Sequence, residues 1–352
     1  MKSWAVKPDA SRAFGSRYKL ALGALTVGAL AWTPGPAHAV AIGYTFQDIV
    51  NTADPTFNQE LGINSAGTIA GYFGSGAAGH PNQGYTTVPP HTSFTNENFP
   101  GSVQTQVTGI NNAGTTVGFW SNTNMGVGLD NNFGFTNVGG TFTNVNHPGG
   151  PTTGLFTDQL LGVNNSNVAV GFYVDAGGAT HGYTYNIGSM TFSGNIDDPN
   201  GVGATTATAI NNSGEIAGFY TDSAGVVHGF TDNAGMFTTI DPTGSTSTML
   251  LGLNDNGLAV GTYIDAAGVM HGLLFDLNND TFENVDDPFG IGTTTINGIN
   301  DLDQLVGFYV NGADNTIGLL ANPVVPEPAS LALLGTALFG IGVVVGRRRR
   351  GE

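Results

Sequence analysis

The chain has 352 residues with 55 glycines, no cysteine and a formal net charge of −17. Without cysteine it has no disulfide, no thiolate metal site and no cysteine nucleophile. All nine Lys and Arg residues lie near the two ends, so residues 20–346 contain no fixed cation. This distribution argues against nucleic-acid binding, which depends on Lys and Arg neutralising phosphates.

The N-terminal residues have the three parts of an export signal. Residues 1–19 carry five positive charges, residues 20–32 form an apolar run, and a small-x-small pattern ends with Ala37 and Ala39. We predict a signal peptide over residues 1–39, which signal peptidase cleaves after Ala39. A transmembrane anchor is the alternative, but this apolar run is too short for a bilayer core of about 30 Å.

One short motif recurs six times in the body, residues 40–323. Each copy begins with an Asn that is followed seven residues later by a Gly, as in Asn211 and Gly218. The copies stand 43 to 53 residues apart. Their first residues are Asn64, Asn111, Asn164, Asn211, Asn254 and Asn300. A period of this length indicates a repeat architecture.

Each copy holds four short runs rich in β-branched and aromatic residues, separated by turn residues. The stretch from Asn211 to Gly214 fits a type I turn whose fourth residue tolerates positive φ. A second turn of the same kind follows in most copies, as at Asp222 to Gly225. Four strands per copy, six times over, predict an all-β, six-bladed β-propeller.

The two ends of the body complement each other. The last copy has only three strands and ends at Pro323, whereas residues 42–55 have the pattern of a fourth, closing strand. We therefore predict that the N-terminal strand completes the sixth blade and closes the ring. An open β-solenoid is the alternative, and it gives no reason for this match.

The repeat is best preserved from Asn164 to Pro288, where it resembles the HAF-type extracellular repeat of bacteria. The resemblance implies a secreted repeat protein and brings no assigned chemistry. The first two copies have longer second turns. The His of the repeat is kept at His181, His228 and His271 and is replaced in the other copies by Gln83, Phe133 and Ile317.

The repeated His and Asp residues could ligate metals, but a simpler prediction fits them better. Equivalent positions in successive blades seldom converge, so we expect His181, His228 and His271 to form local hydrogen bonds. An Asp-x-x-Gly turn uses its carboxylate to cap backbone N–H groups, and no calcium-loop pattern is present. We therefore expect turn capping, not calcium ligation, at Asp175, Asp222 and Asp265.

No motif in the body identifies a catalytic residue. The paired acids Asp197–Asp198 and Asp286–Asp287 precede Pro at equivalent strand ends, which indicates turns and not the acid pair of a glycosidase. Catalytic residues usually break a repeat, and the departures here are loop lengths. The best candidates, beside inter-blade loops, are Glu60, Glu97 and Asp158. We expect no catalytic residue, no metal site and no cofactor beyond weak calcium binding by the acidic surface.

The C-terminal residues form a second targeting signal. An uncharged stretch, residues 329–346, is just long enough to span a bilayer, and positive flanks stay on the cytoplasmic side. It is preceded by the triplet Pro326, Glu327 and Pro328 and followed by Arg347, Arg348, Arg349 and Arg350.

This order, over residues 324–352, resembles the PEP-CTERM sorting signal of Gram-negative bacteria. The resemblance implies cleavage near the triplet by an exosortase, a membrane transpeptidase-like enzyme, after transient anchoring in the inner membrane. It also implies delivery to the cell surface or to exopolysaccharide. A plain transmembrane anchor is the alternative.

These features predict a secreted, exosortase-sorted protein of the cell surface or biofilm matrix with a structural, adhesive or exopolysaccharide-associated role. A polysaccharide-acting glycosidase or lyase on a propeller and a non-catalytic glycan-binding module are the alternatives. Carboxylates with an aromatic platform at the channel mouth would favour an enzyme, whereas Gly, Ala and Thr there would favour a scaffold.

Overall fold

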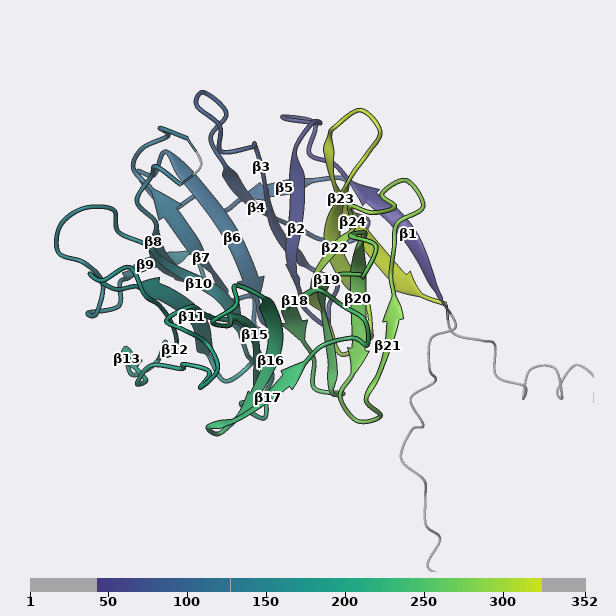
Figure 1. The fold of residues 1–352 in the computed structure, drawn as a ribbon. Coiled ribbons are helices and arrows are strands. Elements are labelled where there is room, and N and C mark those ends of the chain that lie inside the picture. Colours follow the sequence, from purple (N-terminus) through teal and green to yellow (C-terminus); the bar gives the residue numbers. More distant parts are fainter. Residues whose placement is uncertain (1–42, 127, 325–352) are drawn as a thin grey trace, which may run out of the picture. The chain divides into compact units, whose positions relative to one another are not determined.

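The structure is a computed structural model, which describes residues 43–126 and 128–324. These residues form 24 strands in six four-stranded antiparallel sheets, each of which is one blade (Figure 1). The part of the chain that is described contains no helix with the length and apolar character needed to cross a bilayer. The predicted signal peptide, sorting triplet and transmembrane segment lie outside these residues, and the signal peptide and transmembrane segment stay predictions.

The strands follow the repeat, one blade after another. Blade one contains β2 (Asn58–Ile63), β3 (Ile69–Phe73), β4 (Gln83–Thr87) and β5 (Phe94–Asn96). Blade two contains β6 (Gln104–Ile110), β7 (Thr116–Ser121), β8 (Phe133–Val138) and β9 (Thr141–Val145). Blade three contains β10 (Asp158–Val163), β11 (Val168–Val174), β12 (Thr180–Asn186) and β13 (Thr191–Phe192).

Blade four contains β14 (Thr205–Ile210), β15 (Ile216–Thr221), β16 (Val227–Asn233) and β17 (Met236–Ile240). Blade five contains β18 (Ser247–Leu253), β19 (Leu258–Ile264), β20 (Met270–Asp276) and β21 (Thr281–Asn284). Blade six contains β22 (Thr295–Ile299), β23 (Leu305–Val310), β24 (Thr316–Pro323) and β1 (Tyr44–Ile49).

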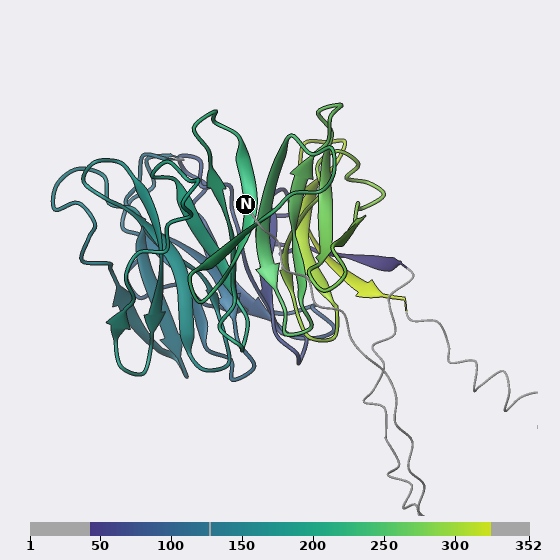
Figure 2. The ribbon, with the colours of Figure 1, turned by 60° about the horizontal axis from the view of Figure 1, so that its bottom comes forward.

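The ring closes as predicted, because β1 is the outer strand of the last blade. It pairs antiparallel with β24, from Tyr44 opposite Pro323 to Ile49 opposite Gly318. The first strands of successive blades contact one another around the whole ring, and β2 contacts β22 (Figures 1 and 2). The closed ring confirms the six-bladed propeller, and the solenoid alternative is wrong.

The motif glycine lies against the backbone of the inner strand of its blade. A Cβ atom added to Gly218 would lie 2.1 Å from the backbone oxygen of Thr206 and 2.8 Å from the ring of Phe230 on the third strand. Each of the other five motif glycines meets a backbone oxygen of the inner strand at 1.9 to 2.4 Å in the same way. A side chain at this position would therefore push the inner strand away from the second strand.

The inner strands approach one another closely at a β-bulge that all six blades share. The bulges fall at equivalent positions, such as Glu60/Gly62 and Val107/Gly109. A Cβ atom at Gly62 would lie 3.0 Å from the backbone of Gly109 in the next blade. Five blades have glycine here, and blade four has Ala209. The centre of the ring is consequently narrow, with two small hollows of about 70 and 80 Å³.

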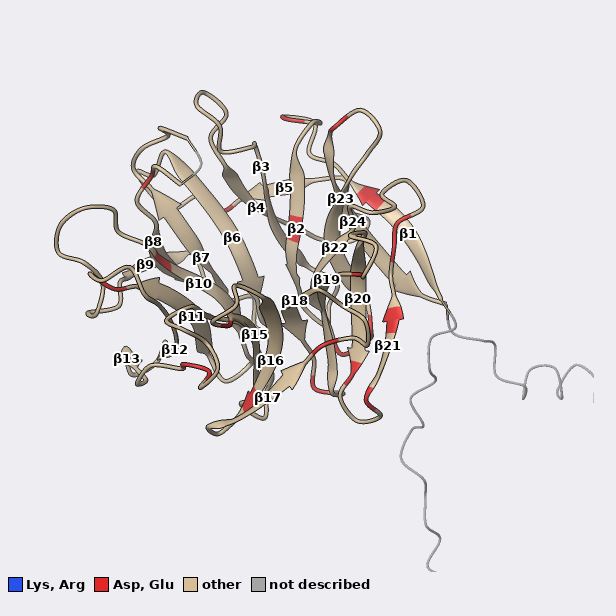
Figure 3. Ribbon diagram, in the orientation of Figure 1, with Lys and Arg blue, Asp and Glu red and all other residues tan. Residues whose placement is uncertain are grey.

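Charge on the propeller has one sign. Figure 3 shows most Asp and Glu residues at strand ends and in loops, one acidic residue within β2, and no Lys or Arg in the described residues. Ion pairs with Lys or Arg are therefore absent from residues 43–126 and 128–324, and the blades are held by packing and hydrogen bonds.

Candidate functional site

The Asn that begins each motif joins neighbouring blades. Oδ1 of Asn64 accepts hydrogen bonds from the backbone N–H groups of Ala66 and Thr68, both at 3.0 Å. Its Nδ2 donates to the backbone oxygen of Asn111 in the next blade at 3.1 Å. The same link is present at five of the six junctions, including the closing one from Asn300 to Asn64. The motif is thus structural.

The channel mouth at this end is lined by a second ring of polar residues. At five of the six junctions the backbone N–H donates to a side-chain oxygen in the next blade, as from Asn165 to Asn212 at 2.8 Å. The ring consists of Ser65, Asn112, Asn165, Asn212, Asp255 and Asp301. Two carboxylates are present, but no aromatic residue lines the mouth. The mouth therefore has neither the aromatic platform expected of an enzyme nor the Gly, Ala and Thr lining expected of a scaffold.

In blades three, four and five, the repeated His lies between two Asp side chains. Its Nδ1 atom pairs with the Asp near the end of the blade, at distances of 2.6 to 2.9 Å. Its Nε2 atom lies 3.5 to 3.6 Å from the Asp that begins the second turn. The three groups, which we call the His–Asp clusters, are Asp175–His181–Asp197, Asp222–His228–Asp241 and Asp265–His271–Asp286.

The His–Asp clusters behave as the sequence predicted, because their bonds are local. Oδ1 of Asp222 caps the backbone N–H groups of Ala224 and Val226 at 2.8 and 2.9 Å. These bonds help to hold the pKa of Asp222 below its ordinary value. In the described residues, no group of three or more His, Asp or Glu side chains is arranged to hold a metal ion.

Two of the clusters raise the pKa of their His residue. The hydrogen bond that His271 donates to Asp286 raises the pKa of His271, followed by the charge of Asp286 and the effects of Asp265, while burial opposes them. Burial also lowers the pKa of His228, but Asp241 and Asp222 together outweigh it and raise the pKa. For His228 and His271, folding therefore stabilises the imidazolium form relative to an ordinary His side chain.

Glu60 is a departure from the repeat that the sequence analysis did not recognise. It is the third residue of β2 and is fully buried. The same position before the bulge holds aliphatic residues elsewhere, namely Val107, Leu160, Ala207, Leu250 and Ile296. The expectation that only loop lengths depart from the repeat was therefore wrong. Without an alignment against the strand register, a single acid in a strand is easily read as a loop residue.

The surroundings of Glu60 keep it protonated. Its Oε1 atom accepts a hydrogen bond from the hydroxyl of Tyr85 at 2.5 Å, while its Oε2 atom has no partner. Burial raises the pKa of Glu60 to about 8, and the bond to Tyr85 opposes this only in part. A Cβ atom at Gly318 in blade six would lie 2.7 Å from Oε1, so the carboxyl lies at the closing junction of the ring.

The other two candidate acids lie at different blade junctions. Asp158 begins β10, where it accepts hydrogen bonds from the hydroxyl of Tyr183 at 2.5 Å and from the backbone N–H of His147. Burial raises its pKa to about 7. Glu97 follows β5 and accepts a hydrogen bond from Asn137 at 2.7 Å. The structure does not bring the three candidates together.

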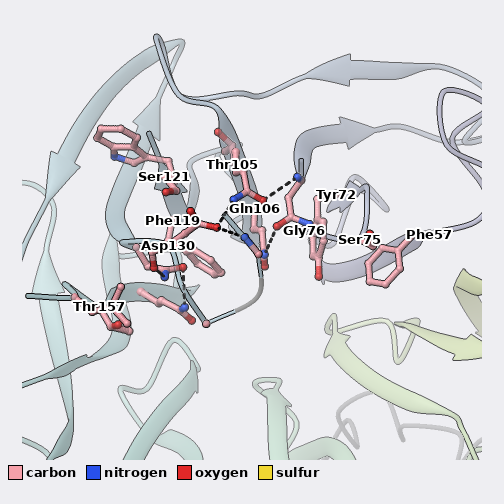
Figure 4. A pocket seen from close by; sticks show the side chains of 18 residues that line it. Phe57, Tyr72, Ser75, Gly76, Thr105, Gln106, Phe119, Ser121, Asp130 and Thr157 are labelled. Carbon is pink, nitrogen blue, oxygen red and sulfur yellow. Dashed lines mark hydrogen bonds between the residues drawn. The ribbon is translucent and has the colours of Figure 1, made fainter. Parts of the chain in front are cut away.

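A pocket of about 550 Å³ opens where the inner strands begin (Figure 4). The motif Asn residues follow the inner strands, so they lie at the opposite end. The walls of the pocket come from the starts of β6 and β10, the end of β7 and described residues of three loops, namely 74–82, 122–126 with 128–132, and 146–157. In blades three to five, the connection that corresponds to the first two loops is a short turn, such as residues 175–179. Loop length, the departure noted in the sequence, therefore builds this pocket.

Aromatic side chains and side-chain amides line the pocket together. The aromatic residues are Phe57, Tyr72, Phe119 and Trp120, and the amides are Asn82, Gln104, Gln106, Asn132 and Gln159. The sequence held a signal for it. A Gln stands five residues before the motif Asn in the first three copies, at 59, 106 and 159, and is Thr206, Met249 and Thr295 in the last three.

Asp130 is the one acidic side chain among the residues that line the pocket, and it fixes the wall. Its carboxylate accepts hydrogen bonds from Thr123 Oγ1 at 2.6 Å, the Met125 N–H at 2.9 Å and Gln104 Nε2 at 3.1 Å. Burial alone would raise its pKa, but these bonds together hold the pKa below its ordinary value. Asp130 is therefore an anion whose acceptor capacity is used by the loop.

The chain combines a β-propeller with a C-terminal sorting signal. Residues 324–350 match the PEP-CTERM protein-sorting motif. This match confirms the predicted sorting signal, which implies processing by exosortase and export across the membrane to the cell surface or extracellular space. No curated protein matches the sequence significantly.

Several solved structures resemble the propeller at low sequence identity. TolB from Acinetobacter baumannii has a TM-score of 0.49 and 10% identity, and the match covers 72% of this chain and 63% of TolB. An ulvan lyase, which is a polysaccharide lyase, has a TM-score of 0.44, 10% identity and coverage of 78% and 80%. The Aleuria aurantia lectin has a TM-score of 0.45, 10% identity and coverage of 80% and 99%.

Proposed function

We propose that this chain is a non-catalytic propeller of the cell surface or extracellular matrix, with a structural, adhesive or exopolysaccharide-associated role. The observation that carries the proposal is the sorting motif at residues 324–350, which directly follows a closed ring. The motif supplies the destination, and the ring supplies a rigid unit to be displayed there.

The construction of the ring supports a scaffold role. Side-chain bonds of the motif Asn residues join blade to blade, and β1 ties the last blade to the start of the body. The acidic surface, without Lys or Arg among the described residues, favours solubility and weak, distributed binding of calcium outside the cell.

An enzyme acting on polysaccharide is less well supported. A glycosidase needs two carboxyl groups about 5 to 10 Å apart across the scissile bond. Glu60, Glu97 and Asp158 are separated among blade junctions, and the two carboxylates at the Asn-ring mouth are bonded to backbone or side-chain groups. The pocket favours a different second function, glycan binding without turnover.

Fractionation of cells with and without exosortase tests the proposal. We expect the protein to move from the inner membrane to the surface or medium, with a lower mass at its C-terminus, only when exosortase is present. The variant Glu327→Ala should behave like the wild type in cells without exosortase. His80→Gln, a change on an exposed loop, is the matched control. Unchanged distribution and C-terminal mass would reject the proposal.

A further inference from the structure

We propose that the pocket of about 550 Å³ on blades one to three binds an uncharged segment of polysaccharide. The inference rests on the proposed function, because it names the matrix component that an exported scaffold would hold. The volume lies within the range of about 300–1,000 Å³ for small-molecule sites. The chemistry of the wall selects the class of ligand.

The charge of the pocket excludes ionic ligands of either sign. No Lys or Arg occurs in residues 20–346, so nothing in the pocket can neutralise a uronate, a sulfate or a phosphate. The carboxylate of Asp130 is already satisfied by hydroxyl, amide and backbone donors, so it offers little to a cation. A neutral ligand with many hydrogen-bonding groups remains.

Two glutamines present free acceptors that are held in place. Nε2 of Gln106 donates to Oδ1 of Asn82 at 2.8 Å, and Nε2 of Gln159 donates to Oδ1 of Asn132 at 3.2 Å. The partners are themselves fixed, because Asn82 donates to the backbone oxygen of Gly74 at 2.5 Å and Asn132 to that of Asp130 at 2.9 Å. Within the described residues, neither Gln side-chain oxygen accepts a hydrogen bond. Sugar hydroxyl groups are suitable donors, and preorganised acceptors lower the entropic cost of binding.

The apolar part of the wall suits the C–H faces of sugar rings. Phe57 is half-buried, and its ring centroid lies 6.1 Å from that of Tyr72. Phe119 lies on the same side of its sheet as Gln106, because the two residues are paired across β6 and β7. Figure 4 shows Gln106 and Phe119 on one side of the pocket and Phe57 and Tyr72 on the other. Apolar surface with a few fixed polar groups is what small-molecule sites require.

The same residues argue for binding without cleavage. Asp130 is the one acid that lines the pocket, and its hydrogen bonds hold its pKa low, so it is ill-suited to act as a general acid. A glycosidase requires a second carboxyl group across the bond. The site assigned here therefore holds a chain of neutral sugars and leaves it intact.

The test uses the full chain, purified in mild detergent, and calorimetric titration. The probes are the neutral and acidic fractions of the producing cells' exopolysaccharide, separated by anion exchange, together with cellohexaose and maltohexaose. We expect binding of the neutral fraction and none of the acidic one. Preference for the acidic fraction, or no binding of the neutral one, would overturn the proposal.

Variants locate the site. Gln106→Ala and Gln159→Ala should each weaken binding about 3- to 10-fold, because one hydrogen bond contributes about 0.5–1.5 kcal/mol. Met249→Ala changes the equivalent position in blade five, outside the pocket, and should leave binding unchanged. Unaltered affinity in both Gln variants, with urea midpoints equal to that of the wild type, would overturn the assignment. If Gln106→Ala is destabilised, Gln159→Ala alone decides.

Failure of the site and failure of the proposed function can be told apart. Sorting depends on the C-terminal motif, so the Gln variants should reach the surface with the same C-terminal mass as the wild type. Loss of binding with normal sorting supports the site. Normal binding with no dependence on exosortase would reject the proposed function and leave the site standing.

Discussion

The connection between the second and third strands is built in two ways in this ring. In blades three to five it is a short turn, capped by Asp and linked to the His of the third strand, as in Asp222 and His228. In blades one and two it is a long loop, and Gln83 or Phe133 stands at the His position. The turn closes the edge of a blade, whereas the loops enclose a pocket.

The two designs use different forces for the same task. In blade three, Tyr173 packs against His181 with ring centroids 5.3 Å apart, and the His is held by Asp residues. In blade two, Trp120 packs against Phe133 at 5.0 Å and against Phe99 at 4.5 Å. Aromatic packing therefore replaces the polar cluster in blade two, where the connection begins with Asn122 and not with Asp. One connection of a repeat can therefore lengthen and line a pocket if neighbouring aromatic side chains stabilise the blade in place of the His–Asp cluster.

Exchanging the connection gives the largest expected effect. Residues 122–131 are replaced by residues 175–179 of blade three, and Gln104→Thr is added because Thr157 is its equivalent. Binding of the neutral glycan should fall below detection, because the exchange removes one wall of the pocket together with Asp130 and the hydrogen bonds that hold this wall. Titration measures the loss, and circular dichroism shows whether the β-structure is retained. Retained affinity in a folded variant would contradict the claim that the long loop of blade two forms the binding pocket.

The buried acid in blade one gives the next largest effect. Folded Glu60 keeps its proton up to about pH 8, whereas the unfolded side chain ionises near 4.5. Between these values the unfolded state binds fewer protons, so the free energy of unfolding falls as pH rises. The limit is roughly 1.4 kcal/mol per pH unit. Below pH 4.5 the stability is fully present.

The double variant Glu60→Leu/Tyr85→Phe gives blade one residue types that other blades have at these two positions, namely Leu160 and Leu250 for Glu60 and Phe135 and Phe230 for Tyr85. Its free energy of unfolding should decline less than that of the wild type between pH 5 and pH 8, because a buried polar pair is replaced by apolar packing. Urea denaturation across this range measures the difference. Asp158 contributes a similar slope in both proteins and cancels in the comparison. Equal slopes would show that Glu60 is not protonated in the fold.

The His–Asp clusters of the regular blades give the smallest effect. His228→Gln should lower the free energy of unfolding by about 1 kcal/mol at pH 5.5 and by less at pH 9. The sign follows from the raised pKa of His228, since its stabilisation is present below 6.5 and lost as pH rises through the folded value. Urea midpoints measure the change, and His80→Gln, on an exposed loop, is the control. A loss that grows with pH would contradict the cluster's role.

The repeat could be predicted from the sequence because local chemistry dictates it. Asn at the first turn position, a residue tolerant of positive φ at the fourth and a Gly seven residues after the Asn all lie within one short segment of the chain. Asn167 and Asp303 have φ values of 56° and 59° at the fourth position, as expected. The closure followed from counting strands.

The pocket could not be predicted in the same way, because its walls meet only after the ring has formed. The loops before β4, β8 and β10 are far apart in the chain, and nothing in their composition fixes their approach. The three glutamines were visible, but their common direction depends on the register of β2, β6 and β10. Glu60 was missed as a core residue for the same reason, since burial on one face of a strand needs the bulge position.

The pairing of β1 with β24 has a consequence for the order of events during secretion. Thr45 and its partner Asn322 are 277 positions apart. In an export that begins at the N-terminus, β1 therefore stays unpaired until β24 has also crossed the membrane. Contacts this distant in sequence form slowly, and an unpaired strand edge can join another molecule in the meantime. Repulsion between chains of uniform negative charge would discourage such encounters until the final strand arrives.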